Sequence, residues 1–349
     1  MDKYILITGG TGYIGSHVIF ELYNLGYDKI IIVDSLINST TTTLQNIYKL
    51  IGKMPLFYNL DLKLSFNELN IIFKTFDIDA VIHLASLKSV PESIENPIKY
   101  YDNNVIGIIN LLTIMNNNNC KKIIFSSSAT VYGNNETCET NIINPDEINN
   151  PYGQTKYICE RIIKDMSIYN NFKAIILRYF NPIGYHHSGL IGDNLSNTNL
   201  FSTICKLVKN DIENKNENKN ENKNKSPIKL TIFGNNYNTY DGTCIRDYIH
   251  VCDLACAHIK AIDKLNEMKN NYEIYNIGTG NGTSIKELID TFSIFYPIEY
   301  VIGKKREGDI PFSCCECTKM NNELLFFPKY NIYDACSDGY NYILQLFNS

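Results

Sequence analysis

Tyr152 and Lys156 form a pair of side chains that could move a proton in a controlled way. They lie four positions apart directly after Pro151, a residue that suits the first turn of a helix. Residues at i and i+4 share one helix face, so the phenol and the ammonium point into the same space. A tyrosine with a pKa of about 10 is a poor base at neutral pH, but a nearby cation favours its phenolate form. The pair therefore predicts a general acid–base centre.

A glycine-rich turn follows a short apolar run near the start of the chain. Tyr4–Ile7 is typical of a buried strand, Gly9, Gly12 and Gly15 follow it, and a helical pattern begins at Val18. In a strand–turn–helix context the first glycine permits the tight turn. The second lets the backbone approach a pyrophosphate, and the third lets helix and strand pack closely. The Gly-x-x-Gly-x-x-Gly spacing predicts a dinucleotide site, although an ordinary turn is the alternative.

Asp34 strengthens the nucleotide interpretation. It ends a second apolar run, Ile30–Val33, about 20 residues after the glycines, where a carboxylate can hydrogen-bond the adenosine ribose. A carboxylate there repels a 2′-phosphate, which favours NAD over NADP. Asp61 follows the run Leu56–Leu60 and is placed to hydrogen-bond the adenine, although a plain turn residue fits this position too.

The order of the motifs favours chemistry at the tyrosine. A Tyr-x-x-x-Lys spacing also arises by chance in a chain with 25 tyrosines, and an exposed helical pair is the alternative. Here the pair follows a dinucleotide pattern and a strand, Lys122–Phe125, that leads to Ser128. We expect the Ser128 hydroxyl to hydrogen-bond the same reacting hydroxyl as Tyr152. The nicotinamide of NAD⁺ and Lys156 together could supply the roughly 4–5 kcal/mol that brings the phenol pKa to about 6–7.

Apolar runs and helical patterns alternate about six times through the first half of the chain. This predicts an α/β fold with a doubly wound parallel sheet of the Rossmann type. We assign residues 1–180 to this NAD-binding domain. His83 lies inside an apolar run and is expected in the core rather than in catalysis. Lys88 follows the carboxyl end of that run, where ligands gather in open parallel sheets.

After Asn181 the regular alternation stops. Residues 181–349 are expected to form a smaller lobe that binds substrate over the carboxyl ends of the strands. Residues 209–225 are rich in Asn, Lys and Glu and contain no apolar residue after Ile212. We expect a disordered surface insertion there, between a helix ending at Val208 and a strand over Ile228–Phe233; an interaction tail is the alternative.

Composition excludes several classes of protein. The 349 residues are 44% hydrophobic, and the net charge of −5 comes without a basic block, which argues against a nucleic-acid surface. We see no signal segment and no long apolar span, so we expect a cytoplasmic protein that does not contact membranes. Eleven cysteines indicate reduced thiols rather than a disulfide framework. Cys314, Cys315 and Cys317 have no second ligand pair at zinc spacing, so no metal site is predicted.

Six segments carry a resemblance to a known family. TGGTGYIGSH, FSSSATVYG, NPYGQTK and RYFNPIG are similar to the extended short-chain dehydrogenases/reductases. In the second half, GTCIRDYIHV and KREGDIP narrow the resemblance to the UDP-galactose 4-epimerases. The similarity extends from about residue 4 to residue 345 and is interrupted mainly by residues 209–225.

The resemblance implies a mechanism and an assembly. UDP-galactose and UDP-glucose would be interconverted by a homodimer. Tyr152 would take the proton from the sugar O4 while C4 gives its hydride to tightly held NAD⁺. The 4-keto sugar would then present its other face, and the hydride would return with Tyr152 as the acid.

The resemblance also implies two sets of site residues. Cofactor contacts are expected at Gly9, Gly12, Tyr13, Ile14, Gly15, Asp34, Asp61, Lys88, Asn103, Tyr152, Lys156 and Phe180. Substrate contacts are expected at Lys88, Ser128, Tyr152, Asn181, Asn199, Leu200, Phe233, Arg246, Arg306, Asp309 and Ser313. The two arginines would hold the diphosphate by charge-assisted hydrogen bonds; without the resemblance, ordinary surface ion pairs would explain them as well.

Two departures from related patterns bear on the reaction. Relatives that dehydrate nucleotide sugars carry acidic residues where this chain has Ala129 and Thr130, so water loss is disfavoured. Ser313 stands where many epimerases restricted to galactose and glucose carry a tyrosine, so we expect room for the N-acetyl group of UDP-GlcNAc and UDP-GalNAc. The alternatives are another nucleotide-sugar oxidoreductase, such as a 4,6-dehydratase, and a non-catalytic NAD-binding regulator, which would be expected to lose the Tyr152/Lys156 pair.

Overall fold

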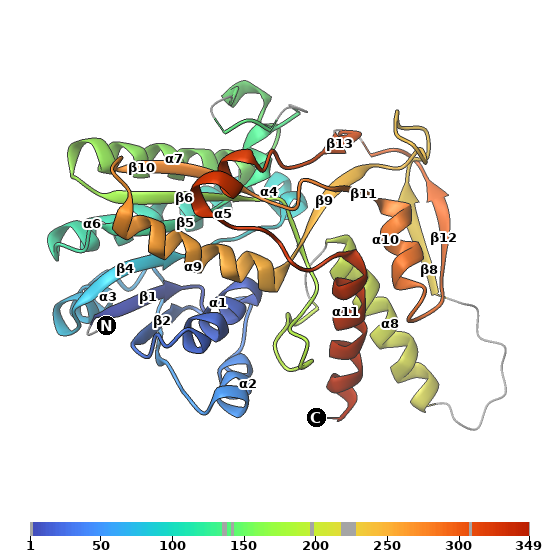
Figure 1. Ribbon diagram of the computed structural model, residues 1–349, viewed down its shortest axis with the longest axis horizontal. Helices are drawn as coiled ribbons and strands as arrows, with labels where there is room; N and C mark the ends of the chain where they lie inside the picture. The colour runs from blue at the N-terminus through green and yellow to red at the C-terminus, as the bar shows by residue number, and fades with distance from the viewer. Residues whose placement is uncertain are drawn as a thin grey trace.

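A seven-stranded parallel sheet forms the centre of the computed structural model, which describes residues 3–134, 138–140, 143–195, 199–217, 228–306 and 309–348. Its strand order is β10-β6-β5-β4-β1-β2-β3, and all neighbouring strands run parallel (Figure 1). The strands are β1 (Tyr4–Thr8), β2 (Ile30–Asp34), β3 (Leu56–Asn59), β4 (Ile78–His83), β5 (Lys122–Ser128), β6 (Lys173–Tyr179) and β10 (Tyr272–Ile277). The predicted doubly wound parallel sheet is confirmed.

Helices cover both faces of this sheet, because successive side chains of a strand point to opposite sides. Ile5 and Ile7 of β1 belong to the core on one face, whereas Leu6 between them belongs to the core on the other. The first face carries α1 (Tyr13–Asn24), α2 (Thr42–Ile51) and α9 (Val251–Glu267). The second face carries α3 (Phe66–Thr75), α6 (Gly107–Asn117) and α7 (Pro151–Tyr169).

The domain boundary expected at residue 180 needs a correction. α9 and β10 lie in the second half of the sequence, yet β10 pairs with β6 along its whole length and α9 packs on α1. Without β10, the buried strand β6 would leave a row of unpaired backbone groups at the sheet edge. α9 also brings fully buried apolar residues to the sheet, among them Leu254 and Ala257. The dinucleotide domain is therefore completed by residues far along the chain.

The remaining residues after 180 form a smaller lobe beside the sheet (Figure 1). In this lobe β9 pairs with β7, β11 and β13, and β8 pairs with β12. Its strands are β7 (Asn181–Ile183), β8 (Ile228–Phe233), β9 (Ile245–His250), β11 (Gly282–Ser284), β12 (Ile298–Gly303) and β13 (Phe312–Ser313). Its helices are α8 (Leu200–Glu217), α10 (Ile285–Phe292) and α11 (Ile332–Asn348). Phe201, Leu288 and Ile343 bring these three helices into one apolar core.

Part of the segment expected to be disordered is helical. Residues 209–217 continue α8, and ion pairs one turn apart join Lys209 to Glu213 (3.1 Å) and Lys215 to Asp211 (2.7 Å). Lys and Glu are good helix formers, and such i,i+4 pairs stabilise an exposed helix although no core is buried. Residues 218–225 of the expected insertion lie outside the described residues.

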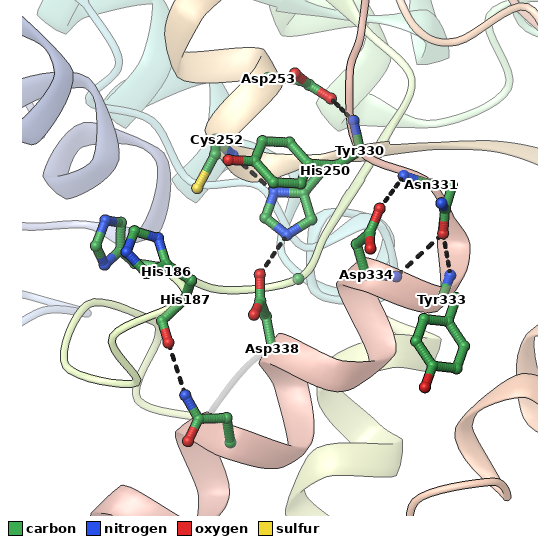
Figure 2. A network of polar contacts seen from close by, with 12 residues as sticks. His186, His187, His250, Cys252, Asp253, Tyr330, Asn331, Tyr333, Asp334 and Asp338 are labelled. Atoms are coloured by element: carbon green, nitrogen blue, oxygen red, sulfur yellow. Dashed lines mark hydrogen bonds and ion pairs between the residues drawn. The ribbon is translucent and has the colours of Figure 1, made fainter.

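A buried polar contact joins the C-terminal helix to the rest of the lobe (Figure 2). Nδ1 of His250, at the end of β9, accepts a hydrogen bond from the backbone N–H of Cys252 over 3.1 Å. Nε2 of the same ring lies 3.3 Å from a carboxylate oxygen of Asp338 on α11. Tyr330 stacks on the imidazole with ring centroids 4.5 Å apart, and its backbone N–H donates to Asp253 of α9 (2.9 Å). α9, β9 and α11 are thereby held together.

The long helix expected over Pro97–Met115 is divided into three parts. α4 (Val90–Glu95) precedes α5 (Pro97–Tyr100), a π-helical segment spans Tyr101–Ile106, and α6 completes the run. Among the described residues, no helix has both the length and the apolar character needed to cross a membrane.

Candidate active site

The glycine turn between β1 and α1 forms a cradle without side chains. Gly9 has a φ of +72°, and a Cβ at this position would lie 2.7 Å from the backbone N of Ala85. A Cβ on Gly15 would lie 2.4 Å from the carbonyl oxygen of Gly9. α1 begins at Tyr13, and Gly12 before it offers no capping side chain to the first-turn N–H groups. The cradle therefore fits a pyrophosphate, which helix N-termini bind through such free N–H groups.

The carboxylate of Asp34 is fixed at the end of β2. One oxygen accepts the backbone N–H of Thr11 (3.1 Å), and the other accepts the N–H of Leu36 (3.0 Å) and the hydroxyl of Ser39 (3.2 Å). Carboxylate oxygens have about four acceptor positions between them, so one position is left for a ribose hydroxyl. Asp61, two residues after the end of β3, lines the same cavity. Both residues stand where the sequence places them, at carboxyl ends of neighbouring strands.

One continuous cavity of about 1070 Å³ extends from the glycine turn to the lobe. This volume is at the upper end of the usual range for ligand pockets, as expected of a site for a dinucleotide together with a second ligand. Predicted cofactor residues in its wall are Gly9, Gly12, Tyr13, Ile14, Gly15, Asp34, Asp61, Lys88, Asn103 and Phe180. Predicted substrate residues in its wall are Asn181, Asn199, Arg246, Arg306 and Asp309. Ser128, Tyr152 and Lys156 line it between these two groups.

Leu200, Phe233 and Ser313 are expected substrate contacts that do not line this cavity in the part of the chain described. Leu200 begins α8, next to the cavity residue Asn199. Phe233 lies one contact behind the wall, with the Arg306 guanidinium 3.7 Å from its ring centroid. Ser313 pairs with Arg246 between β13 and β9, and its hydroxyl hydrogen-bonds the thiol of Cys138.

α7 and β5 bring the three candidate catalytic side chains together. The side chain of Asn150 caps α7 by accepting the N–H of Gly153 (2.8 Å), which places Tyr152 in the first helical turn. Lys156, one turn later, has its Nζ 5.8 Å from the centre of the Tyr152 ring and donates to the carbonyl of Ser126 (2.7 Å). The Ser128 hydroxyl, at the end of β5, hydrogen-bonds the phenol.

Burial dominates the electrostatics of this centre. It raises the pKa of Tyr152 to about 12, and the hydrogen bond with Ser128 offsets only part of that. Burial also lowers the pKa of Lys156 to about 8, so its ammonium is protonated at neutral pH but weakly held. Lys156 is expected to help lower the pKa of the phenol, but the side chains alone do not lower it. The desolvation of Tyr152 outweighs the effect of the Lys156 ammonium, which is already hydrogen-bonded to the carbonyl of Ser126. A further positive charge beside the phenol would lower its pKa, and the nicotinamide ring of NAD⁺ carries such a charge.

Lys88 is suited to an anionic ligand. Desolvation by the protein atoms around the cavity lowers the pKa of its ammonium, and the charge of Asp193 opposes that effect. Its Nζ lies 5.9 Å from the centre of the Tyr13 ring, close to the start of α1. Lys88 lies on the cavity wall with an exposed side chain, so a phosphate or ribose oxygen of a ligand can reach its ammonium and favour the charged form.

Two asparagines that the sequence analysis missed hold the site in shape. Asn104 accepts the N–H of Leu87 (2.9 Å) and donates to the hydroxyl of Thr155 (3.1 Å), which joins the loop of Lys88 to α7. It lies in the π-helical segment, a feature common at functional sites but without a sequence signature. Asn150, by contrast, stands before Pro151, a spacing that predicts a helix cap. His83 is a core residue as expected, 3% exposed and bonded to the hydroxyl of Thr8 (2.7 Å).

A family model described as "NAD dependent epimerase/dehydratase family" matches residues 5–278 of this chain. The chain belongs to this family. The expected family and the expected NAD cofactor are therefore confirmed. The fold-level expectation of a Rossmann-type domain with a C-terminal lobe is confirmed as well, because the epimerases of known structure superpose on nearly the whole chain.

Individual relatives are similar over almost the full length. The chain is 41% identical to UDP-glucose 4-epimerase GEPI48 of Cyamopsis tetragonoloba, covering 98% of this chain and 95% of the relative. It is also 41% identical to the bifunctional protein gal10 of Schizosaccharomyces pombe; that match covers 99% of this chain but only 48% of the relative, so the chain spans about half of that protein. The crystal structure of UDP-glucose-4-epimerase from Stenotrophomonas maltophila, with bound NAD and formylated UDP-arabinopyranose, superposes with a TM-score of 0.89. It is 34% identical over 99% of both chains.

Proposed function

We propose that this chain is a UDP-glucose 4-epimerase that interconverts UDP-galactose and UDP-glucose with bound NAD. The observation that carries the proposal is the position of Tyr152, Lys156 and Ser128 in a single cavity, between a dinucleotide cradle and two lobe arginines. Relatives named UDP-glucose 4-epimerase, and a similar structure that holds both NAD and a UDP-sugar, support it.

Substrate binding is assigned to the lobe side of the cavity. Arg246 and Arg306 carry two positive charges there, and guanidinium groups bind phosphates through paired, charge-assisted hydrogen bonds. Arg246 is held by its own Nη1, which donates to the carbonyl of Ile310 (2.9 Å). Asn181 is fixed by a bond from its Nδ2 to the carbonyl of Asp247 (3.0 Å) and leaves its side-chain oxygen for the ligand. Anchoring at the diphosphate leaves the hexose free to turn between its two faces.

Proton transfer is assigned to Tyr152. When bound, NAD supplies the acceptor for the hydride of C4 and its return. The phenolate of Tyr152 accepts the proton of the sugar O4 hydroxyl, and Ser128 holds that oxygen by a hydrogen bond. After the sugar has turned, the phenol gives the proton back to O4 on the opposite face. Lys156 keeps a positive charge beside the phenol throughout, which favours the phenolate form that the first step requires.

The test is an assay of the purified protein with UDP-galactose and no added NAD. We expect UDP-glucose to form, with no net absorbance of reduced NAD and no loss of water, the latter being the mark of a dehydratase. Tyr152→Phe removes the proton-carrying oxygen and is expected to lower kcat by about a thousandfold. A wild-type protein that binds NAD but forms no UDP-glucose would point instead to the non-catalytic alternative.

We also propose that UDP-GlcNAc and UDP-GalNAc are substrates. The support is Ser313, a small residue on β13 whose register partner is the cavity residue Arg246. Comparing turnover of UDP-GlcNAc with that of UDP-glucose tests this, and undetectable turnover of the acetylated sugar would end it.

We propose that the chain forms a homodimer and that it is located in the cytoplasm. Ile98 of α5, Ile106 of the π-helical segment and Ile109 of α6 are 77%, 40% and 44% exposed, as suits a helix face that meets a second copy. Sedimentation at micromolar concentration should give about twice the mass of one chain. All eleven cysteines are free thiols, as suits a reducing compartment.

A further inference from the structure

A buried network of charged groups adjoins the candidate catalytic centre without belonging to the cavity wall. Its core is the ion pair of Glu160 and Arg178, which are 2% and 1% exposed. Nη2 of Arg178 donates to one oxygen of Glu160 over 2.6 Å, and Nε donates to the other over 3.0 Å. Neither side chain is among the described residues that line the cavity, so a direct contact with ligand is not their role.

Three consecutive serines at the end of β5 connect this ion pair to the reacting groups. The hydroxyl of Ser127 donates to Glu160 (2.5 Å), and the carbonyl of Ser126 accepts from Lys156 (2.7 Å). The hydroxyl of Ser128 hydrogen-bonds the phenol of Tyr152. Glu160 follows Lys156 by one turn of α7. The end of β5 and the start of α7 are therefore connected at three successive residues, Ser126, Ser127 and Ser128.

The network continues beyond β5 and α7. Nη1 of Arg178 donates to the hydroxyl of Tyr132 (3.0 Å) and to the carbonyl of Thr140 (3.0 Å). Tyr132 in turn donates to the side-chain oxygen of Asn276 on β10 (2.6 Å). A buried ion pair is costly unless its hydrogen bonds are made, and this one is surrounded by partners. Such a pair is better suited to fixing geometry than to adding stability.

We propose that Glu160 is a positioning residue for proton transfer: it locks α7 onto the end of β5 through Ser127, and its charge supports the ammonium of Lys156. This inference rests on the proposed epimerase function, because it assigns Glu160 a role in the same proton-transfer step. The role is indirect, and the contact with substrate stays with Tyr152 and Ser128.

The titratable groups around Lys156 determine how the loss of Glu160 changes the pKa values in the site. Titratable neighbours of Lys156 are Tyr152, Cys159 and Glu160 on its own helix and His83 on β4, and Tyr179 on β6 interacts with Tyr152. Burial lowers the pKa of Lys156, and Cys159 and Glu160 act in the opposite direction. Burial also lowers the pKa of His83 to about 3, so this ring is neutral near pH 7. Removing the carboxylate leaves Arg178 and Lys156 as uncompensated cations, which lowers the pKa of both the Lys156 ammonium and the Tyr152 phenol.

The pH profile of kcat in the NAD-loaded enzyme tests the proposal. We expect Glu160→Gln to move both limbs of the profile to lower pH by about one unit, with KM for UDP-galactose unchanged. The double variant Glu160→Gln/Arg178→Gln removes both charges and is expected to return the limbs to their wild-type positions. Ser127→Ala keeps both charges and loses the hydrogen bond that links Glu160 to β5, so kcat should fall about tenfold at an unshifted optimum, with KM unchanged although Ser127 lines the cavity.

A matched control removes a similar charge from the opposite end of the sheet. Asp79 pairs with Lys122 at the start of β5 over 3.0 Å, and Asp79→Asn should leave kcat and its pH profile unchanged. A loss of stability in Glu160→Gln without any shift of the profile, or wild-type kcat in Ser127→Ala, would overturn the proposal. If Glu160→Gln does not fold, Ser127→Ala alone decides. Failure of the epimerase function itself shows differently, as a wild-type enzyme that forms no UDP-glucose at any pH.

Discussion

The two sides of the cavity are built in opposite ways. On the cofactor side, Asp34 ends the parallel strand β2 and Lys156 lies near the start of α7; both side chains are hydrogen-bonded and buried, with exposed fractions of 8% and 3%. On the lobe side, Arg246 is half-buried and Arg306 is exposed, and they come from separate small strands and loops. In the proposed mechanism, the chemical step would thus lie on the buried side of the cavity and substrate capture on the more exposed side.

This division separates two kinds of kinetic effect. A side chain that stabilises charge formed during the reaction, as proposed for Lys156 beside the phenolate, acts on the transition state, so its loss lowers kcat. A side chain that is exposed and orders around the ligand contributes binding in the ground state and the transition state alike, so its loss raises KM. Substitutions on the cofactor side should therefore lower kcat, and substitutions on the lobe side should raise KM.

The largest effect is expected for Lys156→Met on the cofactor side. The variant keeps the length and packing of the side chain but removes the cation beside the phenol, so kcat should fall by roughly a thousandfold. KM for UDP-galactose should change little. In the wild type, kcat should decline as the pH rises above about 8, because the ammonium of Lys156 then loses its proton. Steady-state kinetics between pH 6 and 10 measure both effects.

The control for this variant is Lys164→Met, an exposed lysine two turns further along the same helix. It should leave both kinetic constants unchanged. A Lys156→Met enzyme with a raised KM and an intact kcat would mean that this lysine binds substrate rather than supporting the phenolate, and the division between the two sides would fail.

The second largest effect is expected on the lobe side. Arg306→Ala removes a guanidinium that lies over Phe233 and faces the cavity, so KM for UDP-galactose should rise by roughly ten- to a hundredfold with kcat largely kept. Arg306→Lys should recover part of the loss, because a point charge replaces a planar fork. Lys229→Ala, an exposed lysine on β8, is the control. A fall in kcat alone would show that Arg306 belongs functionally with the cofactor side.

The same contrast explains how much could be predicted from the sequence. On the cofactor side, strands and turns are local, so Gly9, Asp34 and Ser128 could be placed at strand ends from apolar runs and spacing. On the lobe side, Arg246 and Arg306 became candidates through family resemblance, because nothing local brings β9 and the loop after β12 together. Three features could be predicted neither from local patterns nor from the family resemblance. They are the position of β10 in the sheet, the π-helical segment that contains Asn104, and the ion pair of Glu160 and Arg178.

Acid stability provides a third test, at the level of single histidines. Burial lowers the pKa of His83, inside the sheet, to about 3, whereas His187 in the lobe is exposed. Because the unfolded chain binds the proton near pH 6.5 and the folded chain does not, this group costs stability as the pH falls below 6.5. At pH 5 the cost is about 2 kcal/mol.

His83→Gln should therefore flatten the pH dependence of the unfolding free energy by about 2 kcal/mol between pH 7 and pH 5. His187→Gln should leave that dependence as in the wild type. Urea titrations at the two pH values measure the difference. Equal slopes for all three proteins would show that His83 is protonated in the folded state, and that the core of the sheet is less dry than its contacts indicate.

A smaller and more selective effect is expected for Ser313→Tyr. The phenol would occupy the space beside Arg246 and Cys138, so turnover of UDP-GlcNAc should fall about tenfold more than that of UDP-glucose. Ser313→Ala, which removes only the hydroxyl, should leave the ratio of the two activities unchanged. Equal losses for both sugars would show that the tyrosine disturbs β13 rather than the sugar pocket.

The smallest effect concerns the far end of α8, the part of the lobe that composition alone makes look unstructured. Because residues 209–217 are helical, Lys209 and Glu213 interact across one turn, and a double-mutant cycle with alanine at both positions should give a coupling energy of about 0.3–0.5 kcal/mol. The coupling should weaken at high salt, because both side chains are partly exposed. A coupling energy of zero at low salt would show that residues 209–217 are not helical in solution. The lobe would then be ordered only where its helices share the apolar core of Phe201, Leu288 and Ile343.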